Sequence, residues 1–418
     1  MSYEFIIIGI TILMGFVASI LFEKTRISQV IVLMFFGFLL GPVLGIMDVS
    51  PTSVIVSILP FIATLALIIL LFDGGMEFDI FTMAKAIPKS MLFTLVVFIV
   101  SIILVTVFCI YGLGWPLTHG ALLGAVIGGI SSAVVITMVE KTGVKNETKS
   151  LLTVEATMTD ALCIITAVLL IEIIIAGGEV PSFDVVANTL LSQFTIAILF
   201  GLLAAIFWIG ITEKFSMLNY GYMLMLATVF ILFAITQSVK GNGGIAVFVF
   251  GLLLGNARKL GKMTRIELEN PISRMMKSFQ EEVTFFVRTF FFVYIGLLLS
   301  IDHFSFDIII VSLGLVGILA IARFIVQKTV LGSMLKRDGN VTMAMMPRGL
   351  AAAVLATLPI TSGIIIANFQ ELVLGVLLFS NIAATIGVFI LDKEDKNCEN
   401  VKPISKSAKN AKPKKTKE

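Results

Sequence analysis

The chain has 418 residues, of which 58% are hydrophobic and only 14% are charged, and its net charge at pH 7 is +3. Its mean hydropathy is +1.06. A soluble domain does not need so much apolar surface, so the composition excludes a soluble protein and indicates an all-α polytopic membrane protein.

Hydrophobic runs along the chain predict thirteen transmembrane helices, because each run approaches the length that crosses a bilayer. The expected ranges are 5–22, 29–47, 54–72, 88–111, 118–139, 149–176, 185–212, 221–238, 243–256, 279–300, 306–330, 340–360 and 368–391. Glu4 and no basic residue precede the first run, which predicts a retained helix rather than a cleaved signal peptide.

Lysine and arginine are distributed unevenly between the connections of these helices. The odd-numbered connections are rich in basic residues, whereas the even-numbered ones contain Lys240 alone. Because basic residues favour the cytoplasmic side, we expect an N-terminus outside and a C-terminus in the cytoplasm. Termini on opposite sides of the membrane require an odd number of spans, which agrees with the expected thirteen.

Two polar segments interrupt this pattern. Residues 258–279 are too polar to span, and they predict an amphipathic helix on the inner surface. Nine lysines follow Asp392, and the last 26 residues are rich in Lys, Ser and Pro. We therefore expect a transmembrane domain over 1–392 and a disordered basic tail over 393–418, which contacts either water or anionic lipid.

Two of the expected spans carry helix-breaking residues at their centres. The run at 118–139 contains GGISS, with Ser131 and Ser132, and the run at 340–360 contains Pro347, Arg348 and Gly349. Unwound backbone inside a membrane is tolerated only where it lines a cavity or is buried in protein. Two matched breaks predict an inverted repeat whose binding site lies where the half-helix ends meet. The alternative is a pair of kinked packing helices.

The run Leu151–Ile165 places two carboxylates, Glu155 and Asp160, within a membrane-spanning helix. A carboxylate near the middle of the bilayer is costly and is usually functional. Thr153, Thr157 and Asp160 share one helix face, and oxygen ligands suit either a small hard cation or a proton. We expect the monovalent cation to be bound by oxygen-bearing residues of this helix and of the first break: Asp160, Thr159, Thr157, Ser131 and Ser132.

Buried arginines require carboxylate partners. We expect Glu155 to pair with Arg348, which leaves Asp160 as the titrating ligand, and a weaker link between Asp73 and Arg288. Glu172 and Arg323 lie near helix ends, where they could reach the interface, so no mechanism is assigned to them.

Through three motifs the sequence resembles the monovalent cation/proton antiporter superfamily, most closely its NhaP-like sodium/proton exchanger branch. They are EATMTDAL, FFVRTFFFVYIGL and MMPRGLAAAVL, and the resemblance covers residues 1 to about 392. It implies two crossed, interrupted helices in a core domain, a separate dimerisation domain, a homodimer and a prokaryotic cell membrane. It also implies that Asp160 is the transport aspartate, that Glu155 pairs with an arginine, and that Arg288 and Arg348 are the two buried arginines of the branch.

The sequence departs from the family pattern at the expected site. Thr159 stands where an asparagine usually precedes the aspartate, and Ser131, Ser132 and Ala133 replace a Thr-Asp-Pro motif. The serine pair resembles the sequence at this position in potassium-efflux and related antiporters of the other branch. The transported cation is therefore expected to be Na⁺ or K⁺.

These features predict a secondary antiporter, not an enzyme, that exchanges one cation for one proton at Asp160 without net charge movement. A cation channel and a membrane sensor are the alternatives from other classes, although no repeated filter sequence or fused regulatory domain is present. The three cysteines lack a metal-binding spacing, so no cofactor is expected. We expect membrane lipid as a partner, and neither nucleic acid nor a nucleotide.

Overall fold

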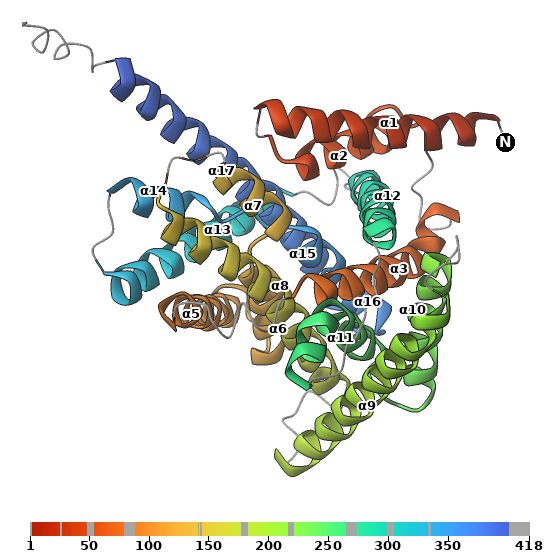
Figure 1. Ribbon diagram of the computed structural model, residues 1–418. Coiled ribbons are helices and arrows are strands. Elements are labelled where there is room, and N and C mark those ends of the chain that lie inside the picture. Colours follow the sequence, from red (N-terminus) through yellow and green to blue (C-terminus); the bar gives the residue numbers. More distant parts are fainter. Residues whose placement is uncertain are drawn as a thin grey trace, which may run out of the picture.

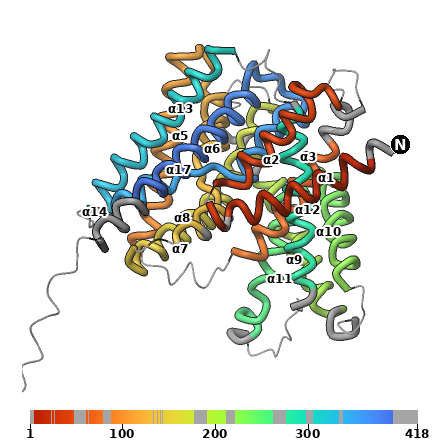
Figure 2. The backbone as a smooth tube through the Cα atoms, turned by 90° about the horizontal axis from the view of Figure 1, so that it is seen from above, coloured from red at the N-terminus to blue at the C-terminus, as the bar shows by residue number. Residues whose placement is uncertain are grey.

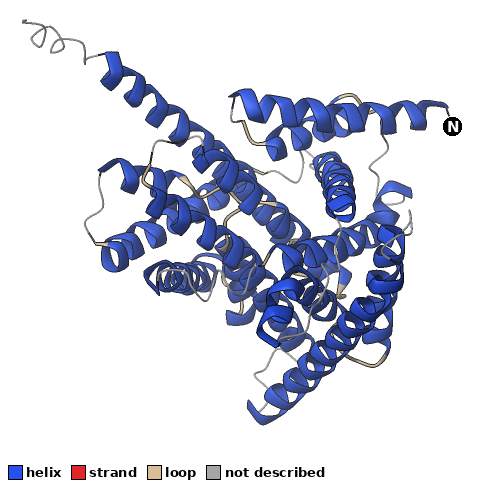
Figure 3. Ribbon diagram, in the orientation of Figure 1, coloured by secondary structure: helices blue, strands red, loops and turns tan. Residues whose placement is uncertain are grey.

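The structure is a computed structural model that describes residues 2–25, 27–47, 54–78, 88–140, 142, 144–176, 183–215, 221–264, 274–298, 305–332 and 336–400. Within these ranges the regular structure is helical throughout (Figure 3). Eight of the described helices are long and apolar enough to cross a membrane. This confirms the expected all-α, multi-span architecture.

The helices fall into two groups that lie side by side (Figures 1 and 2). The first group contains α1 (Ser2–Thr25), α2 (Gln29–Phe38) with the π-helical turn η1 (Leu39–Val43), α3 (Val54–Glu77), α9 (Phe183–Phe215), α10 (Gly221–Ser238), α11 (Gly243–Thr264) and α12 (Arg274–Leu298). The second contains α5 (Pro88–Leu113), α6 (Leu117–Gly128), α7 (Ser132–Glu140), α8 (Asn146–Ile175), α13 (Phe306–Val326) with η2 (Gln327–Leu331), α14 (Lys336–Ala344) and α17 (Phe369–Asn400). The short helices α15 (Leu350–Leu355) and α16 (Leu358–Thr361) lie where the groups meet.

Glycines set the spacing within the first group. A Cβ atom on Gly75 of α3 would overlap the carbonyl of Phe248 on α11, and one on Gly37 of α2 would overlap that of Val293 on α12. Helices that lack a strong hydrophobic driving force in lipid gain stability from such close approach. The first group is therefore packed backbone against backbone.

Two expectations about polar segments differ from the structure. The separate amphipathic helix expected over 258–279 is wrong in its described parts, because α11 continues to Thr264 and α12 already begins at Arg274. Residues 265–273 lie outside the described ranges. The expected boundary at 392 falls inside α17, which extends to Asn400, and residues 401–418 are also outside the described ranges.

Candidate functional site

The two interrupted segments cross each other at their unwound stretches. The first breaks between Gly128, where α6 ends, and Ser132, where α7 begins. The second breaks between α14 and α15, and its Pro347 carbonyl accepts a hydrogen bond from the backbone N–H of Ser131 at 2.8 Å. Gly349 packs so closely on Ser131 that a Cβ atom would overlap the serine side chain. Both expected interruptions are thus confirmed, and each supplies a partner to the backbone of the other.

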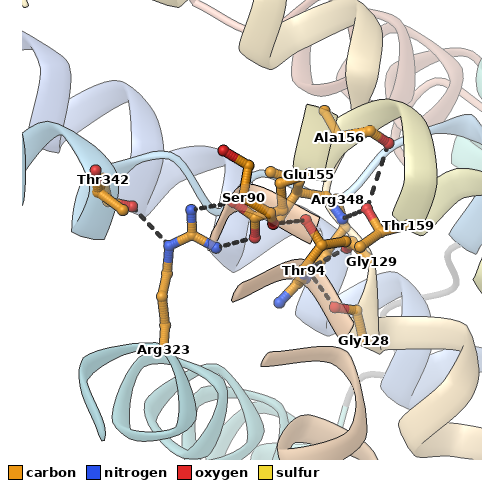
Figure 4. A network of polar contacts seen from close by, with 11 residues as sticks. Ser90, Thr94, Gly128, Gly129, Glu155, Ala156, Thr159, Arg323, Thr342 and Arg348 are labelled. Atoms are coloured by element: carbon orange, nitrogen blue, oxygen red, sulfur yellow. Dashed lines mark hydrogen bonds and ion pairs between the residues drawn. The ribbon is translucent and has the colours of Figure 1, made fainter. Parts of the chain in front are cut away.

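Arg348 joins the two interruptions through its side chain (Figure 4). Its guanidinium donates to the carbonyl oxygens of Gly128, at 3.3 Å, and Gly129. These carbonyls form the C-terminal end of α6, which carries a partial negative charge, so a buried cation is stabilised there. On the other side, the peptide of Arg348 is held by α17, with Ser380 Oγ accepting from its N–H at 3.2 Å and Asn381 Nδ2 donating to its carbonyl at 2.7 Å.

The expected pair of Glu155 with Arg348 is wrong, because Glu155 pairs with Arg323. Both guanidinium Nη atoms bond the carboxylate, with Nη2 and Oε2 2.8 Å apart, and the two side chains are 3% and 1% exposed. Arg323 Nε also donates to the Thr342 carbonyl in the last turn of α14 at 2.6 Å. The position of Arg323 near a helix end suggested that its side chain could extend to the membrane surface. The structure shows instead that the side chain is buried. It neutralises Glu155 and caps α14, while the guanidinium of Arg348 is bound to backbone carbonyls instead.

Asp160 lies in a different environment, on a cavity of about 460 Å³ between the two helix groups. Its carboxylate accepts hydrogen bonds from the backbone N–H and the hydroxyl of Ser132, at the first residue of α7. Ser131 and Thr157 line the same cavity. The positive end of a half-helix and nearby hydroxyls thus surround one carboxylate, an arrangement that suits binding of either a cation or a proton.

Thr159 does not line this cavity. Its hydroxyl accepts a hydrogen bond from the Ile130 N–H at 3.1 Å and donates to the Ala156 carbonyl at 3.3 Å, and the side chain is 1% exposed. The structure therefore brings together Asp160, Thr157, Ser131 and Ser132, and it places Thr159 behind them as a support for the unwound backbone. Adjacent positions on a helix face different ways, which accounts for the difference.

The opposite wall of the cavity belongs to the first helix group. It includes Asp73 from α3, with Thr284 and Arg288 from α12. Asp73 accepts hydrogen bonds from Thr284 Oγ1 at 3.2 Å and from Gln280 Nε2 at 3.5 Å. Arg288 is near enough to act electrostatically on Asp73, but no ion pair joins them among the described residues, and its buried Nε has no hydrogen-bond partner.

The sequence predicted a link between Asp73 and Arg288, but no role for Thr284 or Gln280. Both donors precede Arg288 on α12, at spacings of four and eight residues. That spacing puts them on the helix face that carries Arg288, and it is the signal that could have indicated them.

Comparison with known proteins places this geometry in context. The family model described as "Sodium/hydrogen exchanger, transmembrane" matches residues 9–393. A K⁺/H⁺ antiporter NhaP of Alkalimonas amylolytica is 28% identical over 60% of this chain and 44% of its own length. A probable Na⁺/H⁺ antiporter 2 of Methanocaldococcus jannaschii is 28% identical over 69% of this chain and 67% of its own length.

A solved structure also shares the fold. The sodium proton antiporter MjNhaP1 from Methanocaldococcus jannaschii superposes with a TM-score of 0.71 at 20% sequence identity, covering 96% of this chain and 99% of that chain. The likeness extends over nearly all of both chains.

Proposed function

This chain belongs to the sodium/hydrogen exchanger family, and from that premise we propose that it is a secondary antiporter which exchanges Na⁺ or K⁺ for H⁺ across a membrane. The observation that carries the proposal is the position of Asp160, which faces a cavity between two helix groups at the crossing of two broken helices. Because its relatives include proteins named as Na⁺/H⁺ and as K⁺/H⁺ antiporters, the proposal includes both cations as substrates.

The mechanism follows from competition at one carboxylate. A bare Asp160 is penalised by desolvation when the cavity closes, whereas a protonated or cation-loaded Asp160 is locally neutral and can cross. Ser131, Ser132 and Thr157 would supply oxygen atoms to the cation. The group that contains α8 would then move against the first group and expose Asp160 alternately to either side.

A one-for-one stoichiometry follows from a count of charges on the moving group. Glu155 is neutralised by Arg323, and Thr159 cannot ionise, so Asp160 is the carboxylate that changes its protonation state. The moving group carries the same charge with one proton as with one monovalent cation. We therefore propose electroneutral exchange, which a sustained current on addition of Na⁺ or K⁺ to protein on a solid-supported membrane would contradict.

The finer architecture is part of the same proposal. It comprises thirteen spans in an inverted repeat, a moving core, a dimerisation domain and a homodimer in the lipid of a prokaryotic cell membrane. In this proposal the N-terminus is outside and the C-terminus is in the cytoplasm, since basic residues dominate the odd-numbered connections and favour the cytoplasmic side.

Two alternatives make different predictions. A potassium-efflux type antiporter is favoured by the Ser131–Ser132 pair, and it would prefer K⁺ over Na⁺. A cation channel would conduct cations without countertransport of protons. Liposomes that contain the purified protein and a pH-sensitive dye distinguish all three when Na⁺, Li⁺ and K⁺ are added in turn.

The central test is Asp160→Asn, which removes the titrating group but keeps its shape. We expect loss of cation-driven proton movement in liposomes with little change in thermal stability. Asp307→Asn, in the first turn of α13, is the matched control and should retain exchange. Exchange that persists in Asp160→Asn would refute the proposed mechanism.

A further inference from the structure

We propose that Gln280 and Tyr222 are positioning residues that fix the Asp73 carboxylate on the cavity wall opposite Asp160. The inference rests on the proposed function, because it assigns a role to the second wall of the same cation path. It concerns side chains from three helices of the first group, α3, α10 and α12.

A hydrogen-bonded chain links these helices. The Tyr222 hydroxyl of α10 donates to Gln280 Oε1 of α12 at 2.7 Å, and Gln280 Nε2 donates to Asp73 Oδ1 of α3 at 3.5 Å. The same Nε2 atom is 3.3 Å from the hydroxyl of Thr284, which donates to the other oxygen of Asp73. Asp73 is thus held at both oxygens by neighbouring turns of one helix.

Gln280 and Tyr222, the two members of this hydrogen-bonded chain that lie furthest from the cavity, are closed to water, so protein contacts determine their geometry. Gln280 is 1% exposed and Tyr222 is 7% exposed, and the tyrosine ring packs on Phe279 with centroids 4.5 Å apart. A carboxamide can present either its oxygen or its N–H₂ group to a neighbour. Because the tyrosine hydroxyl bonds the amide oxygen, the N–H₂ group is directed towards Asp73.

Asp73 has a position that makes such fixing useful for cation passage. It faces the same cavity as Asp160 from the other helix group, and Arg288 and Glu77 line the wall beside it. An unsupported carboxylate could turn towards Arg288 and form an ion pair with it. The donors from Gln280 and Thr284 hold the carboxylate away from that pairing, so its oxygen atoms remain available to a cation in the cavity.

The experiment compares Gln280→Leu, Tyr222→Phe and Asp73→Asn with the unmodified full-length protein in liposomes. We expect Gln280→Leu to raise the cation concentration for half-maximal exchange about tenfold, the effect of one hydrogen bond to a charged group, without changing the maximal rate. Tyr222→Phe keeps the ring and its packing, and we expect a rise of about threefold. Tyr111→Phe, which removes an exposed hydroxyl elsewhere, is the matched control and should have no effect.

A double-mutant cycle separates positioning from a merely structural role. If Gln280 acts through Asp73, adding Gln280→Leu to Asp73→Asn should cause no further rise. The inference would be overturned if Gln280→Leu raised the half-maximal cation concentration equally with and without Asp73→Asn. It would also be overturned if neither Gln280→Leu nor Tyr222→Phe changed that concentration. In both cases exchange by the unmodified protein would still support the proposed function. If Gln280→Leu does not fold, Tyr222→Phe completes the same cycle.

Discussion

Glu155 and Arg323 form a buried, bidentate ion pair that also holds the end of α14 through the Thr342 carbonyl. Replacing a buried pair by apolar groups can be nearly neutral, but removing one partner leaves an uncompensated charge. The pair therefore acts as a unit, and it should be sensitive to single substitutions in a way that Asp160 is not.

We accordingly predict that Glu155→Gln lowers the free energy of unfolding by about 3–5 kcal/mol, more than Asp160→Asn does. Thermal unfolding of the detergent-solubilised protein measures the difference. Glu147→Gln, at the exposed start of α8, is the matched control. The double variant Glu155→Leu with Arg323→Met should recover most of the loss, and a double variant as unstable as the single one would show that the charge is not the cause.

At the level of helices, the crossing depends on the absence of a side chain at Gly349. The backbone there is extended, with a φ of −122°, so other residues could adopt the conformation and only space limits the position. A Cβ atom would overlap Ser131, which bonds the second interruption through its own N–H.

Gly349→Ala should therefore separate the two interruptions, with a stability loss of about 1–3 kcal/mol from overpacking and a marked loss of exchange. Gly317→Ala on α13 is the matched control, since a Cβ atom at Gly317 meets nothing within 4 Å. Thermal unfolding and liposome assays of both variants provide the comparison. Equal behaviour of the two variants would show that the crossing tolerates a wider spacing.

The crossing also marks how far the sequence could predict this structure. Glycine and proline indicated both interruptions, and hydrophobic runs indicated the helices, because these signals are local. Which arginine reaches Glu155 is not local, since it depends on how α13 and α14 pack around α8. The same limit applies to Thr159, whose hydroxyl is bonded by the Ile130 N–H from another segment of the chain.

Across the whole molecule, the cavity lies between two helix groups, and α17 extends from the second group to Asn400. The residues beyond Asn400 are rich in lysine and lack apolar periodicity.

We predict that truncation after Asn400 leaves the rate of exchange in liposomes within about twofold of that of the full chain, because the lysine-rich sequence that is removed has no apolar periodicity with which to join a packed core. Truncation after Val388, whose side chain is buried in α17, is the comparison and should lower stability. Loss of exchange in a well-folded truncation after Asn400 would assign the tail a direct role.

The reciprocal bonding of the interruptions has a consequence for biosynthesis. Arg348 and the Gly129 carbonyl that it binds are 219 residues apart. At about 5–20 residues per second, about 10–40 s separate their emergence from the ribosome. During that interval the first interruption lacks both the guanidinium and the Pro347 carbonyl, so the newly inserted first half must remain in the membrane with an incomplete hydrogen-bond network until the second half arrives.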